Sequence, residues 1–160
     1  MKETPYLSIV LPLAIIFFAS DSIVTVAAHA RIVDFLLPYW CVLYTLGHSA
    51  IPLLFTALLL MLESLMWHGR LAFALIYLAP AIVTMHLLER TTHWHVVIAS
   101  GGFLSALIIE QYILTPLWHG HIPTVRTTLS YGSASLLFLV LLLGIMQYGQ
   151  ARQSLGNRPR

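Results

Sequence analysis

The chain has 160 residues, of which 59% are apolar and only 9% are charged, and its formal net charge is +2. An average globular protein carries about a quarter charged residues, so eight basic and six acidic side chains cannot cover a water-soluble protein of this size. At roughly 20 residues per helical crossing, the length allows at most six spans and excludes a sizeable domain outside the membrane. The composition therefore predicts an all-α integral membrane protein with no soluble domain.

The apolar runs predict a compact bundle of about six transmembrane helices. The first run is longer than the apolar core of a signal peptide, so we expect it to be a retained span. The predicted spans are Leu7–Ala28, Val33–Leu46, Ile51–Trp67, Leu71–Leu88, Val96–Trp118 and Leu129–Tyr148. The second is short, and the count becomes five if the second and third form one re-entrant hairpin. Glu89–His95 and His119–Thr128 are the predicted internal loops.

The basic residues predict the orientation of the bundle. Residues 1–148 are expected to form a single membrane domain, and residues 149–160 a short basic tail. With six spans, one side of the membrane collects Lys2, Arg90, Arg152, Arg158 and Arg160, and the other collects Arg31, Arg70 and Arg126. Since basic residues favour the cytoplasmic side, both termini are predicted to be cytoplasmic.

Four acidic residues lie within or beside apolar runs, where an ionised carboxylate costs roughly 2.5–3.5 kcal/mol at the centre of a span. We expect Asp21 and Asp34 to lie near the interface and to reach the lipid headgroups. Glu63 is expected to contact Arg70 across the turn between the third and fourth spans, as a structural pair. Glu110 lies near the middle of the fifth span and needs a partner in the bundle, a ligand or a partner subunit. We therefore predict a functional or interface role for Glu110.

Small residues precede Glu110 at a spacing of four. The pairs Gly101/Ser105 and Gly102/Ala106 give one helix face on which another helix can approach closely. The approaching helix can belong to the same chain or to a partner chain, and the spacing does not distinguish them.

The eight histidines do not predict a cofactor. Seven lie in predicted turns or at span ends, and the eighth, His86, lies near the end of a span. Two deep histidines at matching depth, the pattern of a bis-histidine haem, are not found. The single cysteine, Cys41, excludes a disulfide framework and a cysteine-based metal site. With no zinc-protease, phosphate-loop or intramembrane serine-protease pattern, we expect neither a metal, a cofactor nor an enzymatic activity.

Three segments resemble the rod shape-determining protein MreD family of bacterial cell-wall elongation. Leu36–Tyr44 resembles its Pro-x-Trp segment, Leu60–Leu71 its acid-containing end of the third span, and Ala106–Tyr112 the acid of its fifth span. The resemblance covers about residues 33–115, although the family usually has Asp, with a preceding Gly, where this chain has Glu63 and Ala57.

The resemblance implies a non-enzymatic scaffold of the bacterial inner membrane. Such a protein binds the single-span protein MreC and helps to organise the wall-synthesis enzymes and the actin-like MreB. Glu63 and Glu110 would then be structural or interface residues.

Two other functions fit a small helical membrane protein. One is the substrate-binding membrane subunit of an energy-coupling-factor transporter, which needs polar and aromatic side chains that converge on a pocket beneath a long loop. The other is a small haem-bearing or quinone-linked anchor subunit, which needs matched deep histidines.

Overall fold

The computed structural model describes residues 7–28, 33–47, 50–120 and 123–156. Within these ranges every regular element is a helix, as the composition predicts. The elements are α1 (Leu7–Ala28), α2 (Leu36–Thr45), α3 (Ala50–His68), α4 (Ala72–Thr91), α5 (His95–Ile109), the π-helix η1 (Glu110–Leu114), α6 (Thr115–His119) and α7 (Val125–Gly156).

Five stretches of helix are long and apolar enough to cross a membrane. They run over Ile9–Ala27, Ala50–Trp67, Ala72–Thr91, His95–Leu117 and Val125–Gly149. Together with the composition, they indicate a multi-pass membrane protein. The second predicted span contains only the ten-residue α2, which is about 15 Å long. That is half of the roughly 30 Å hydrocarbon thickness of a bilayer.

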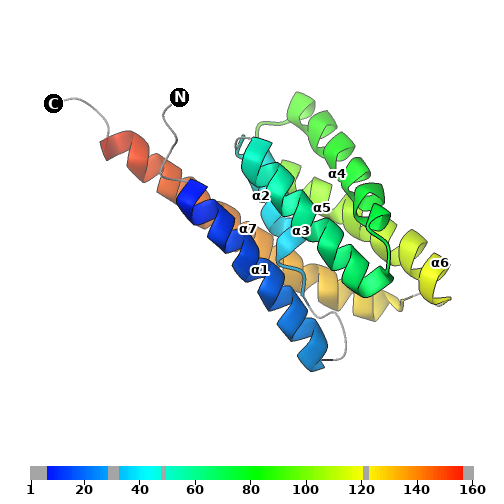
Figure 1. The fold of residues 1–160 in the computed structure, drawn as a ribbon. Coiled ribbons are helices and arrows are strands. Elements are labelled where there is room, and N and C mark those ends of the chain that lie inside the picture. Colours follow the sequence, from blue (N-terminus) through cyan, green and yellow to red (C-terminus); the bar gives the residue numbers. More distant parts are fainter. Residues whose placement is uncertain (1–6, 29–32, 48–49, 121–122, 157–160) are drawn as a thin grey trace.

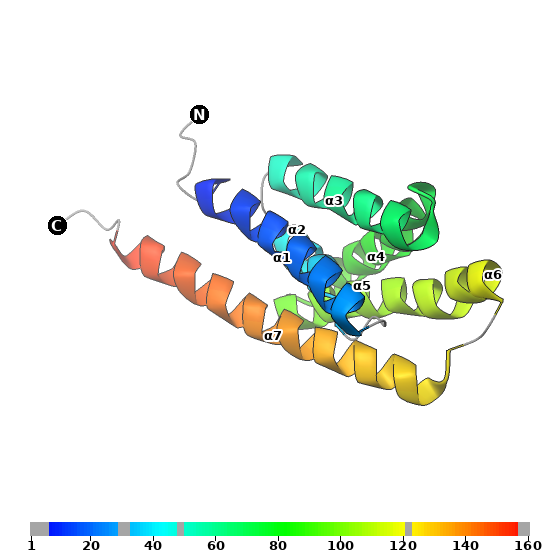
Figure 2. The same ribbon diagram turned by 60° about the horizontal axis from the view of Figure 1, so that its bottom comes forward.

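Among the long helices, α1, α3 and α5 run in one direction, and α4 and α7 run back in the other (Figures 1 and 2). Figures 1 and 2 show the start of α1 and the end of α7 at one end of the bundle, which we call the terminal end. The turn between α4 and α5 lies at this end too, while α6 and the turn between α3 and α4 lie at the opposite end (Figure 1). From α3 onward the long helices therefore alternate in direction along the chain.

The short helix α2 lies at the centre of the bundle, in contact with α1, α3, α5 and α7. Nine of its ten residues are buried. Two polar side chains of α2 bind carbonyl oxygens of its neighbours: Tyr39 Oη donates to Val10 O of α1 at 2.7 Å, and Trp40 Nε1 donates to Leu53 O of α3 at 3.2 Å. Gly47 ends the α2 segment in the left-handed conformation, with φ of +67°, which an L side chain rarely adopts.

The boundaries differ from the predicted ones at both predicted loops and at the tail. The predicted loop at His119–Thr128 is wrong at both ends, because α6 includes His119 and α7 already begins at Val125. The predicted loop at Glu89–His95 is wrong for its first three residues and for its last one, because α4 continues to Thr91 and α5 begins at His95. The polar side chains of the last turn of α4 reach water without ending the helix, and Arg90 suits the negative end of the helix dipole. At the C-terminal tail, α7 continues through the predicted boundary at residue 149 to Gly156, because no helix-breaking proline precedes that glycine.

Candidate functional site

The helix α2 begins in the interior of the bundle, where the amide groups of its first turn are shielded from water. A helix leaves its first four amide groups without intrahelical acceptors, and inside a membrane these groups need partners from the protein. Asp21 lies seven residues before the end of α1, about 10 Å from that end at 1.5 Å per residue. Because the amides at the start of α2 bind the Asp21 carboxylate, α2 begins at that depth in the bundle.

Asp21 supplies acceptors for two of these amides. Its Oδ1 and Oδ2 accept from the amide of Phe35 at 2.9 and 3.1 Å, and Oδ2 also accepts from the amide of Leu36 at 3.0 Å. Asp21 is buried in α1, so a carboxylate from one helix caps the N-terminus of another. The positive end of the α2 dipole favours a negative charge at this position.

Asp34 completes the cap and connects it to α7. Its Oδ1 accepts from the amide of Leu37 at 2.9 Å, and its Oδ2 accepts from the hydroxyl of Tyr131 at 3.1 Å. The amide of Asp34 itself donates to Ser135 Oγ at 2.8 Å. In both bonds of its side chain the Asp34 carboxylate is the acceptor.

The expectation that Asp21 and Asp34 reach lipid headgroups is wrong. Both are buried, with 1% and 2% of their surface exposed, and both bind groups of the protein. Sequence reasoning also missed Tyr131 and Ser135, which lie about a hundred residues away from Asp34. One signal was present, since an aspartate three residues before Leu37 has the spacing of a helix-capping side chain.

Replacing Ser135 with alanine is expected to lower the stability of the bundle by about 1–3 kcal/mol, because the buried amide of Asp34 loses its acceptor. Ser133→Ala is the matched control, since the exposed Ser133 hydroxyl only donates to Ser130 O on its own helix. The melting temperatures of the two variants are measured by thermal unfolding in detergent. Equal melting temperatures for the two variants would contradict the assignment of Ser135 to the cap.

Glu63 and Arg70 flank the turn between α3 and α4. Glu63 is fully buried and Arg70 is exposed, and each has interactions within the structure. The hydroxyl of Ser64 donates to the carbonyl of Arg70 at 3.0 Å and so closes the turn. Gly69, with φ of +66°, ends α3. The proposed pairing of Glu63 with Arg70 remains a prediction.

Glu110 begins the π-helix η1. It is 2% exposed and has interactions within the structure. The carbonyl of Glu110 accepts from the backbone amide of Thr115, five residues on, and from Thr115 Oγ1 at 2.9 Å. Pro116 explains the wider turn, since it has no amide hydrogen and its ring would clash with the carbonyl four residues earlier in a regular α-helix. Such π segments are frequent at functional sites.

Because a π segment is equivalent to one inserted residue, removing one residue there should restore a regular α-helix. In a Pro116→Ala background, we expect deletion of the exposed Ile113 to be tolerated, with a melting temperature near that of the background. Deletion of the exposed Leu104 in the same background turns every later residue of α5 by about 100° and should prevent folding. Equal loss of folded protein in both deletions would contradict the π geometry.

The small residues of α5 lie against α4 of the same chain. A Cβ atom at Gly101 would collide with the Leu88 side chain, and one at Gly102 would lie 2.5 Å from Met85 Cγ. Ser105 is half-buried, and its hydroxyl donates to Gly102 O at 2.8 Å. The spacing of the small residues allowed a helix of the same chain or of a partner chain on this face. In the structure it is α4 of the same chain.

Two histidines, His86 and His95, take part in polar contacts near the terminal end. His86 contacts Glu89 at 3.8 Å and Arg90 at 3.1 Å, and His95 Nδ1 lies 2.9 Å from Gln147 Nε2 of α7. In the described ranges, no three His, Cys, Asp or Glu side chains are grouped so that they could hold a metal ion. His29, His48 and His121, and the side chains of His68 and His119, lie outside the described part of the chain.

Comparison of the chain with protein-family models, with curated protein sequences and with solved structures finds no match.

Proposed function

We propose that the protein is a non-enzymatic scaffold of the bacterial inner membrane that binds a single-span partner through its helix faces. In this proposal it serves the cell-wall elongation machinery, as the resemblance to the MreD family implies. Its partners would be an MreC-like protein and the wall-synthesis enzymes.

The proposal rests on one observation: the polar side chains buried around α2 form hydrogen bonds with backbone groups of the same chain. Asp21, Asp34 and Ser135 bind backbone amides of the protein itself. Tyr39 and Trp40 donate to its backbone carbonyls. Because these side chains bond to the backbone of the protein itself, they stabilise the arrangement of the helices. This favours a structural role over the conversion or transport of a substrate.

The proposal includes six crossings with both termini in the cytoplasm. In it, α2 belongs to the second crossing and covers only about half of the bilayer thickness. The positions of the start of α1 and the end of α7 at the same end of the bundle support this topology (Figure 2).

A pull-down of the tagged full-length protein from its native membrane in a mild detergent tests the function. Mass spectrometry of the eluate should identify a single-span periplasmic partner together with wall-synthesis enzymes. Recovery of ATPase subunits would favour a transporter subunit instead. A Soret band in the absorbance of the eluate would favour a haem-bearing anchor, and either result would overturn the scaffold proposal.

Glu110→Leu is expected to leave the isolated protein folded and to reduce recovery of the partner in the same pull-down. Because Glu110 is buried, its effect on a partner would act through the shape of α5 at the π segment. Ile108→Leu, at an exposed position two residues away, is the matched control and should not change recovery. Undiminished recovery with Glu110→Leu would contradict an interface role for this residue.

A further inference from the structure

A small polar pocket lies at the terminal end of the bundle, at the other end of α2 from the capping aspartates. Its volume is about 140 Å³, whereas a single water molecule needs roughly 10–15 Å³ on the same measure. It is lined by Thr45 of α2, Glu89 of α4, Thr92 and His93 of the following turn, and His95 and Ile98 of α5. Three separate helices thus contribute to its wall.

The charge of this pocket is negative. Among its lining residues only Glu89 carries a formal charge at neutral pH with neutral histidines. Within the described ranges Glu89 is also the one exposed acid, since Asp21, Asp34, Glu63 and Glu110 are all buried. The nearest basic side chain along α4, Arg90, bonds to His86 at 3.1 Å and is not part of the pocket wall.

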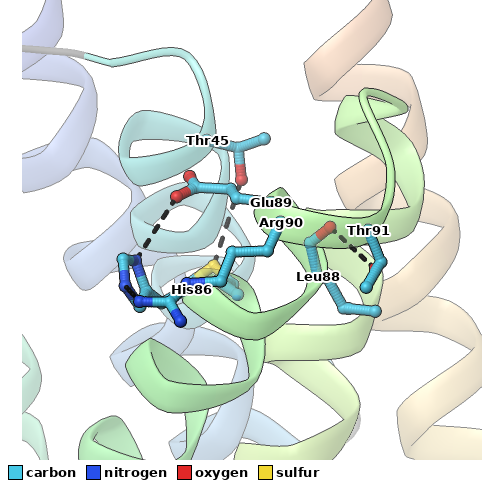
Figure 3. Close-up of polar contacts among 7 residues, drawn as sticks. Thr45, His86, Leu88, Glu89, Arg90 and Thr91 are labelled. Atoms are coloured by element: carbon cyan, nitrogen blue, oxygen red, sulfur yellow. Dashed lines mark hydrogen bonds and ion pairs between the residues drawn. The ribbon is translucent and has the colours of Figure 1, made fainter.

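The end of α2 adds to this negative character. Thr45 is its last residue, and the last carbonyls of a helix form the negative end of its dipole. The Thr45 hydroxyl donates its hydrogen to Cys41 O at 2.7 Å, which leaves its oxygen as an acceptor. Figure 3 shows the Glu89 carboxylate directed toward the ring of His86, at 3.8 Å from its Nδ1.

The pocket lies beside the turn between two candidate membrane spans, Ala72–Thr91 and His95–Leu117, so we expect it at the depth of the lipid headgroups. It opens at the turn that ends α4 at Thr91 and begins α5 at His95. Trp94 in this turn is 74% exposed, and tryptophan side chains at helix ends concentrate at the membrane interface.

From this geometry we infer that the pocket binds a primary ammonium group. Glu89 forms a charge-assisted hydrogen bond with it, and the hydroxyl oxygens of Thr45 and Thr92 accept its other hydrogens. Two sources present this group at the interface: the headgroup of phosphatidylethanolamine and a free aminoalcohol such as ethanolamine.

Native mass spectrometry of the full-length protein in detergent tests the inference. The purified protein is titrated with phosphatidylethanolamine, and in parallel with phosphatidylcholine of the same acyl chains, whose trimethylated nitrogen has no hydrogen to donate. We expect wild-type protein to prefer phosphatidylethanolamine roughly tenfold, and Glu89→Gln to lose this preference, as loss of a charge-assisted hydrogen bond implies. Arg126→Gln, a charge change at the opposite end of the bundle, should keep the preference.

Competition with free ethanolamine distinguishes the two sources. If millimolar ethanolamine displaces the lipid from wild-type protein, the pocket takes the free amine as well. If it does not, the site is specific for the lipid headgroup. Thr92→Val provides a second pocket variant should Glu89→Gln fail to fold, and it should reduce the preference about threefold. Equal affinity for the two lipids, or a preference that the pocket variants leave unchanged, would overturn the inference.

Discussion

Asp21→Leu is expected to abolish folding of the bundle or to lower its stability by about 2–6 kcal/mol. The substitution leaves the amides of the half-buried Phe35 and the buried Leu36 without the acceptors that now lie 2.9–3.1 Å away. Each buried amide left unsatisfied costs about 1–3 kcal/mol. A loss of this size is a large part of the 5–15 kcal/mol that stabilises a typical domain.

The measurement is thermal unfolding of the purified protein in detergent, together with the yield of monodisperse protein from the membrane. Asp21→Asn keeps one acceptor oxygen and should give an intermediate melting temperature. Ile23→Leu is the matched control two residues along α1, where the side chain is 68% exposed, and it should leave the melting temperature unchanged. If Asp21→Leu unfolds at the wild-type temperature, the cap of α2 does not contribute to stability.

The cap also explains which parts of the fold could be predicted from sequence. The long helices follow from uninterrupted apolar runs, and the whole predicted span Leu7–Ala28 lies in α1. The length of α2 could not be predicted from its apolar run, because that run is longer than the helix. Its start is determined by Asp21 on a different helix, and local periodicity carries no information about such a contact.

For the buried acidic residues, the sequence predicted that partners are needed but not which groups those partners are. Asp21, Asp34, Glu63 and Glu110 were identified from their positions in apolar sequence, since such residues need a partner in a membrane. For Asp21 and Asp34 the partners are backbone amides and a tyrosine hydroxyl. Backbone groups have no signature in the sequence, so the choice between headgroup and protein partners required the three-dimensional arrangement.

The small residues of α5 predicted a close helix contact, and only the structure assigns it to α4. Gly102→Val is therefore expected to destabilise the single chain, independently of any partner. An added Cβ would lie 2.5 Å from Cγ and 2.7 Å from Sδ of Met85. Met85 is fully buried and packs between α5 and the Thr45 hydroxyl, which approaches its sulfur at 4.0 Å, so its side chain has little room to move.

Overpacking of this kind typically costs 1–3 kcal/mol, and a valine adds two methyl groups beyond the Cβ. We expect Gly102→Val to lower the melting temperature in detergent by at least several degrees. Gly144→Val on α7 is the matched control, because no atom lies within 4 Å of its added Cβ, and it should unfold at the wild-type temperature. Met85→Ala should partly restore Gly102→Val, since it removes the atoms that clash. Without such rescue, the damage would not come from the contact between α4 and α5.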